Sequence, residues 1–288
     1  MNYRYCLGQD GLALQRNVDT LPLAVKQADG CEPRHVRCDR KRKRSFSGLS
    51  RYSRFERFRF LVSTEFKKII EIKNPNSYES VFATHSLEKL NGLVLKKRIK
   101  NVFRRGKYIL IELESGYLAV HLRMTGNFKT SSDNESDAKH ISVEFILDNK
   151  KSVYYKDYRK FGRVYYFNDL NYLENKLGCE PLSKDFDYQF LKHGLSKSKS
   201  MIKSKLLDQS FIAGLGNIYV DESLWLAKIH PEKKSDTISG IKIRRLTDAI
   251  PMILKKAIEH NGTTIINFSF GNDSIGSYKE KLNVFFII

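Results

Sequence analysis

The chain has 288 residues, of which 41% are hydrophobic, and it carries a formal net charge of +19 with an isoelectric point near 9.7. This length accommodates two domains of ordinary size, and the hydrophobic share is large enough to build packed cores. So basic a chain is expected to bind a polyanion, nucleic acid in the first place, and no apolar run is long enough for a transmembrane helix.

An anionic membrane surface is the other polyanion that a basic protein can bind, but the sequence contains no long basic amphipathic helix. No apolar segment of the secretory kind opens the chain. The four cysteines, at positions 6, 31, 38 and 179, lack the spacing of a disulfide framework. We therefore expect a cytoplasmic monomer with no membrane partner.

Residues 1–60 differ in composition from the rest of the chain. They contain the basic run Arg40–Arg44, followed by arginines interleaved with aromatic residues up to Phe60. A basic arm on a phosphate backbone is one interpretation, but we predict a disordered segment, because blocks of like charge usually stay unfolded. Cys31, His35 and Cys38 suggest a zinc site, yet no fourth ligand lies nearby, so we predict no metal there.

Residues 61–170 show the periodicity of short strands. In Tyr108–Leu113 the residues Ile109, Ile111 and Leu113 alternate onto one face. A short helix that stops at Gly92 is predicted over 86–93, and further strands are predicted over 117–122, 141–147, 152–156 and 163–167. Short strands at hairpin spacing are typical of an antiparallel sandwich or barrel, so we predict a β-sandwich domain.

Residues 171–288 are predicted to form a helical domain, which makes the fold class α+β. Ile218 and Trp225 should share the buried face of one of its helices. The last helix is predicted over 244–260, and Pro251 should kink or interrupt it. The boundary between the two domains therefore falls near residue 170.

Two helices around a glycine-rich turn are the most informative part of that domain. Lys199 and Lys203 are predicted on one face of the first helix, and the second helix begins at Asn217, which is placed to cap it. Gly214 and Gly216 allow positive φ and close approach to a ligand, and the N–H groups at a helix start bind anions. This pattern predicts a site for nucleic-acid phosphate, with a plain helical hairpin as the alternative.

Three short elements in the strand half bear reactive or exposed side chains. Residues 104–107 place three cations around a glycine, where a charged strand edge is the alternative. Residues 121–126 form the end of a strand and place Met124 at a turn, and the alternative is that the Met124 side chain simply fills the core. Residues 157–162 place Arg159 and Phe161 on one side of an extended chain. Exposed side chains of this kind can wedge into a base stack.

These elements occur in the order found in a known family. The order is RRGKY at 104–108, HLRMTG at 121–126, KH at 139–140, DYRKFG at 157–162, DQSFIAGLGNIYVDESL at 208–224, IHPEK at 229–233 and NGTT at 261–264. Over residues 66–284 the chain strongly resembles bacterial formamidopyrimidine-DNA glycosylase, of the helix-two-turns-helix class. The resemblance implies base-excision repair, in which the enzyme flips an oxidised purine such as 8-oxoguanine from duplex DNA, cuts its glycosidic bond and nicks the abasic strand.

The resemblance also implies roles for individual residues. Lys107 corresponds to the lysine at the lesion phosphates, which is given the proton-donor role in β-elimination. Met124, Arg159 and Phe161 correspond to the residues that fill the vacated space and wedge the opposite strand. DNA contacts are implied for His140, Arg159, Lys199, Lys203, Gly216 and Asn217, and residues 271–278 correspond to a loop over the flipped base.

Two features of the family are not found in the sequence. The family begins with a proline whose free amine attacks the sugar, followed by glutamate, whereas residues 1 and 2 here are Met and Asn and no Pro-Glu-Leu-Pro occurs. The family also continues past the position of Val284 into a four-cysteine zinc finger, so we predict no zinc and no other cofactor. We therefore expect the covalent step to be lost or impaired. Two alternatives stay open, a non-enzymatic binder of damaged or abasic DNA and a defective, truncated product.

Overall fold

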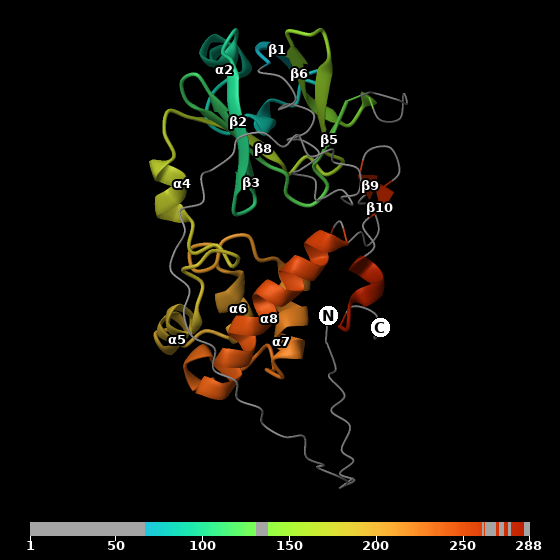
Figure 1. The fold of residues 1–288 in the computed structure, drawn as a ribbon. Helices are drawn as coiled ribbons and strands as arrows, with labels where there is room; N and C mark the ends of the chain where they lie inside the picture. The colour runs from blue at the N-terminus through green and yellow to red at the C-terminus, as the bar shows by residue number, and fades with distance from the viewer. Residues whose placement is uncertain are drawn as a thin grey trace, which may run out of the picture. The chain divides into compact units, whose positions relative to one another are not determined.

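The computed structural model describes residues 67–130, 138–260, 262, 269–270, 274–275 and 278–284, which are coloured in Figure 1. The predicted basic segment 1–60, including Cys31, His35 and Cys38, lies outside these residues. So does most of the loop predicted over 271–278.

Two four-stranded sheets form the first half of the described chain. Hydrogen-bonded neighbours follow the order β1-β6-β7-β5 in one sheet and β2-β3-β4-β8 in the other, and these pairings are antiparallel. The strands are β1 (Ile69–Lys73), β2 (Ile99–Arg105), β3 (Tyr108–Leu113), β4 (Tyr117–His121), β5 (Asn127–Lys129), β6 (Ile141–Leu147), β7 (Ser152–Lys156) and β8 (Arg163–Phe167).

The predicted bounds of β3, β6, β7 and β8 are correct. Strand β4 ends at His121, before its predicted end, because Leu122 already belongs to a turn in which the Gly126 N–H donates to the Leu122 carbonyl at 3.1 Å. Strand β2 was not predicted, because a register shift between Ile99 and Asn101 breaks the alternation of buried and exposed residues along it.

Both faces of β3 are buried. On one face Ile109 and Ile111 belong to a core cluster that also draws on the other sheet, for example through Phe145. On the opposite face Leu110 packs with Leu177 and other residues of the helical half. The turn between β2 and β3 is therefore held against the helical half of the chain.

Helices dominate the second half, as Figure 1 shows, and together with the sheets they confirm the predicted α+β class. None of the helices in the described part of the chain is both long enough and apolar enough to cross a lipid bilayer. The helices of the whole described chain are α2 (Leu87–Val94), α4 (Asn171–Lys176), α5 (Tyr188–Ser196), α6 (Ile202–Leu207), α7 (Asn217–Leu226) and α8 (Gly240–Glu259). Shorter elements are the 3-10 helices η1 (Glu79–Val81), η2 (Ser235–Thr237) and η3 (Tyr278–Lys281) and the two-stranded pair β9 (Ser269–Phe270) and β10 (Ser274–Ile275).

Pro251 does not interrupt α8, which continues to Glu259. A proline inside a helix removes one hydrogen bond and costs about 3 kcal/mol. The buried face of the same helix, with Leu246, Ile250 and Ile253 each less than 5% exposed, offsets that cost by packing. The predicted interruption is therefore wrong, because tertiary burial outweighs local propensity, and a kink at Pro251 stays a prediction.

Three further helix predictions need correction. Helix α6 begins at Ile202, so Lys199 precedes it and shares no helix face with Lys203. Trp225 is 50% exposed and does not lie on the buried face of α7, which carries Val220 and Leu224 instead. Helix α2 runs past Gly92 to Val94.

Candidate nucleic-acid interface

Lys107 reaches from the sheet half of the chain to the glycine-rich turn of the helical half. It directly follows Gly106 in the turn between β2 and β3, where Gly106 has φ +57°. A Cβ atom at Gly216 would lie 4.0 Å from the Lys107 ammonium nitrogen. The fold therefore brings together two of the predicted site residues from distant parts of the sequence.

Asn217 lies exposed at the start of α7. The N-cap is Gly216, and no side chain makes a capping hydrogen bond, so the prediction that Asn217 caps the helix is wrong. The first N–H groups of a helix have no partner within it. Together with the Lys107 ammonium they form a set of hydrogen-bond donors suited to an anion.

Gln209 shapes the turn that leads to Gly216. Its side-chain amide donates to the carbonyls of Leu207 at 2.8 Å and Leu215 at 3.0 Å, and its side-chain oxygen accepts from the Gly214 N–H at 2.9 Å. Gly214 has φ +91°, a conformation that favours glycine. Sequence reasoning missed Gln209, since its three contacts depend on how the turn closes.

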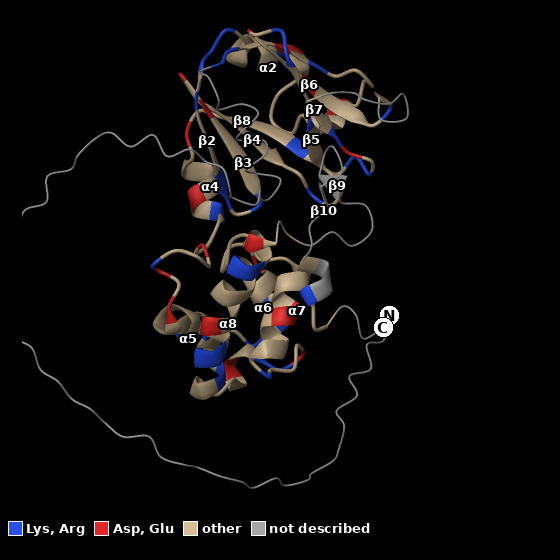
Figure 2. Ribbon diagram, turned by 45° about the vertical axis from the view of Figure 1, so that its right-hand side comes forward, with Lys and Arg blue, Asp and Glu red and all other residues tan. Residues whose placement is uncertain are grey.

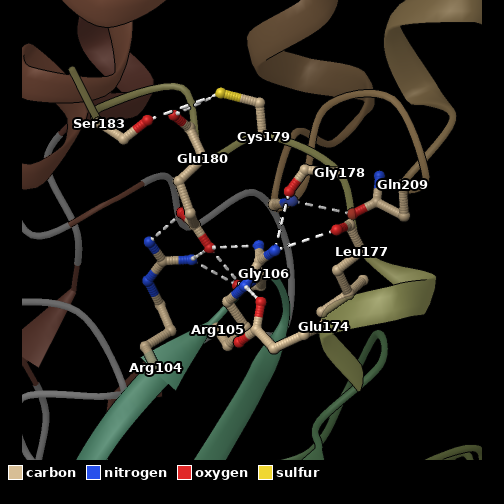
Figure 3. Close-up of polar contacts among 11 residues, drawn as sticks. Arg104, Arg105, Gly106, Glu174, Leu177, Gly178, Cys179, Glu180, Ser183 and Gln209 are labelled. Atoms are coloured by element: carbon tan, nitrogen blue, oxygen red, sulfur yellow. Dashed lines mark hydrogen bonds and ion pairs between the residues drawn. The ribbon is translucent and has the colours of Figure 1, made fainter. Parts of the chain in front are cut away.

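Glu180 anchors the residue that precedes Lys107 (Figure 3). One carboxylate oxygen accepts from the Gly106 N–H at 2.6 Å and the other from Arg104 at 2.6 Å. Arg105 donates to the same carboxylate at 3.4 Å and to the carbonyls of Leu177 and Gly178 at 3.0 and 2.9 Å. Of the three cations predicted around Gly106, two therefore pair within the protein, and Lys107 is the one beside the glycine-rich turn.

The surroundings of Lys107 are electrostatically positive. Burial, and then the nearby Arg123 charge, lower the pKa of Lys107. Burial, Arg123 and Lys107 lower the pKa of His121 to about 4. Cations this close to one another raise the local potential, which a bound anion such as a phosphate relieves.

Met124, Arg159 and Phe161 form an exposed group, which we call the wedge. Met124 is 52% and Phe161 48% exposed, which rules out the alternative that Met124 fills core. The Arg159 guanidinium contacts the Met124 sulfur at 3.2 Å and lies over the Phe161 ring at 4.9 Å. Two loops thus present one apolar and cationic surface.

The other predicted contact residues are His140, Lys199 and Lys203, and His140 and Lys203 make contacts within the protein. The His140 ring lies 4.4 Å from the Tyr158 ring, measured between centroids. Lys203 forms an ion pair with Asp221 at 2.8 Å, which ties α6 to α7, whereas Lys199 lies exposed before α6. Figure 2 shows Lys and Arg in both the sheet half and the helical half of the chain.

Two family profiles match the sequence. The formamidopyrimidine-DNA glycosylase N-terminal domain matches residues 59–164, and the formamidopyrimidine-DNA glycosylase H2TH domain matches residues 177–269. A formamidopyrimidine-DNA glycosylase of Pelotomaculum thermopropionicum is 42% identical over 210 residues, which is 71% of this chain and 76% of that protein.

Solved structures of similar proteins contain damaged DNA. A mutant of the Lactococcus lactis FPG in complex with Fapy-dG-containing DNA has a TM-score of 0.70 at 36% identity and covers 78% of this chain and 83% of its own. MutM in complex with DNA containing carbocyclic 8-oxo-G has a TM-score of 0.70 at 36% identity and covers 80% of this chain and 85% of its own.

Proposed function

The chain belongs to the formamidopyrimidine-DNA glycosylase family, and on that basis we propose that it recognises oxidised purines in double-stranded DNA and removes them. The substrates are 8-oxoguanine and formamidopyrimidines, and the reaction of the family is glycosidic cleavage followed by β-elimination at the abasic site, a covalent step that we expect to be impaired in this chain. The proposed place of action is the bacterial cytoplasm, on nucleoid DNA.

The observation that carries the proposal is the position of Lys107 beside the turn before α7. A phosphate bound there would accept hydrogen bonds both from the Lys107 ammonium and from the N–H groups of Gly216 and Asn217. Because the lowered pKa makes this ammonium a better acid, Lys107 suits the proton-donor role in strand cleavage as well as phosphate binding.

The wedge supports the recognition step. A glycosylase must take the damaged base out of the stack, because the reacting carbon is inaccessible within the duplex. Apolar side chains inserted between base steps open the stack at a cost of about a few kcal/mol per step. Exposed Met124 and Phe161, with Arg159 between them, are suited to occupy the vacated space.

The proposal assigns no role to a metal. Within the described ranges no three His, Cys, Asp or Glu side chains are placed to hold a metal ion together. The chemistry derived for Lys107 and the wedge involves only side chains and backbone groups of this chain.

Borohydride trapping on a duplex with 8-oxoguanine opposite cytosine tests the proposal. The expected result is lesion-selective binding, measured against an undamaged duplex as control, with only a small amount of covalent protein–DNA adduct and nicked strand. The predicted impairment of the covalent step would show as slow or incomplete trapping. Selective binding without any adduct would indicate a non-enzymatic binder of damaged DNA instead of an enzyme. The absence of any preference for the lesion would contradict both functions.

A further inference from the structure

We propose that Asp157 is a positioning residue that joins the two loops of the wedge into one pre-organised unit. The proposal rests on the proposed function, since it concerns the opening of the base stack. Asp157 directly follows β7 and is 1% exposed, so its carboxylate cannot contact DNA itself. Its effect must pass through the residues that it holds.

The carboxylate of Asp157 accepts hydrogen bonds from both loops. One oxygen accepts from the Thr125 hydroxyl, next to Met124, and from the Arg159 N–H at 3.3 Å. The other accepts from the Gly162 N–H, next to Phe161, at 2.7 Å. Arg159 is therefore bonded to Asp157 directly, and Met124 and Phe161 are each adjacent in sequence to a residue that is bonded to it.

Thr125 connects the loops a second time. Its hydroxyl donates to Asp157 and also accepts from the Arg159 N–H at 3.1 Å. The Met124 turn is thus linked directly to the backbone of Arg159. Loss of the carboxylate would leave this hydroxyl without its acceptor.

Tyr155 provides the surface on which both loops close. Its side chain is fully buried, and its hydroxyl donates to Asp157 at 3.5 Å. A Cβ atom at Gly126 would lie 2.5 Å from that hydroxyl oxygen, and one at Gly162 would lie 1.5 Å from it. Both loops therefore use a glycine to approach the same tyrosine, which fixes their separation.

This arrangement has a consequence for DNA binding. Loops that are ordered before binding lose less conformational entropy when they enter the stack. This benefit applies wherever the wedge enters the stack, at an abasic site as well as at a damaged base. It is absent where the protein holds an undamaged duplex by its phosphates and the wedge stays outside the stack.

The Asp157→Asn variant tests this consequence. The amide has nearly the same size as the carboxylate, but its nitrogen donates hydrogen bonds and cannot accept them. One of the two backbone N–H groups that Asp157 binds therefore loses its acceptor. We expect affinity for a duplex with 8-oxoguanine opposite cytosine to fall about tenfold more than affinity for the same duplex with guanine in place of the lesion. Fluorescence of 2-aminopurine beside the lesion should show less unstacking.

Asp185→Asn is the matched control, because Asp185 is exposed in the loop before α5, and its two affinities should equal those of the wild type. If Asp157→Asn does not fold, Thr125→Val removes the bridging hydroxyl at nearly constant shape and should shift the same ratio. An equal loss on both duplexes would overturn the positioning role. Failure of the wild type to prefer the damaged duplex would instead contradict the proposed function.

Discussion

The Glu180 carboxylate accepts the N–H of Gly106 at 2.6 Å, which fixes the backbone immediately before Lys107. Glu180 lies between α4 and α5, and Gly106 lies in the turn between β2 and β3. Because the same carboxylate also pairs with Arg104 and Arg105, the two arginines before Gly106 are engaged within the protein, whereas Lys107 stays available to an anion.

Glu180→Gln should lower both stability and DNA affinity. The amide loses the charge that pairs with two guanidinium groups, and the side chain is only 20% exposed, so we expect a loss of about 2 kcal/mol in the free energy of unfolding. Urea denaturation measures this loss. In the control Glu71→Gln, where Glu71 is 49% exposed and pairs with the exposed Lys73 at 3.4 Å, the change should stay below about 0.5 kcal/mol. Equal losses in the free energy of unfolding of the two variants would show that the Glu180 contacts contribute no more to stability than an exposed ion pair does.

Lys107→Gln should weaken binding to damaged duplex and flatten its dependence on salt. Each phosphate neutralised by a cation contributes about one unit to the slope of log affinity against log salt concentration, so the slope should fall by about one. Fluorescence anisotropy at several salt concentrations measures it. Lys184→Gln changes the same charge at an exposed position outside the proposed site and should leave the affinity for the lesion nearly unchanged. An unchanged slope in Lys107→Gln would remove the phosphate contact from the proposal.

His121 should make the protein less stable as pH falls. Its pKa is lowered to about 4 in the folded state, whereas the unfolded value is about 6.5, so the unfolded state binds the proton first. The stability contribution is present above pH 6.5 and decreases towards pH 4, by up to about 3 kcal/mol.

Denaturation of the wild type and of His121→Gln at pH 7 and pH 5 isolates this contribution. The variant lacks the titrating group and should lose less stability between the two pH values. Neutral His121 also accepts the Arg123 N–H at 3.2 Å in the turn before Met124, so protonation should loosen that turn. The same pH dependence in both proteins would assign the effect to other groups.

Met124→Ala and Phe161→Ala should impair base displacement without destabilising the fold. Both side chains are about half exposed, so each truncation should change the free energy of unfolding by less than about 1 kcal/mol. Fluorescence of 2-aminopurine beside the lesion should rise less when the complex forms with either variant than when it forms with the wild type. A wild-type signal in both variants would exclude the wedge as the opening device.

Several strands were predictable because their signals are local. Strands β3, β6, β7 and β8 alternate apolar residues or run apolar throughout, and their bounds follow from that pattern. Strand β2 was not predictable, because its bulge between Ile99 and Asn101 depends on pairing with β3. Likewise Pro251 gave a strong local signal for a break, which burial of the surrounding helix face overrides.

By itself the sequence determined which segments alternate as strands, how strongly the chain attracts a polyanion, and which motifs place it in a glycosylase family. Only the tertiary structure decided how the site is held. Glu180 meets Gly106 across 74 positions of sequence, and Thr125 meets Asp157 across 32. Both carboxylates act through contacts between segments that adjoin only after the two sheets and the helices have packed. Local propensity and spacing carry no information about such pairs, because the distance between their atoms is set by packing.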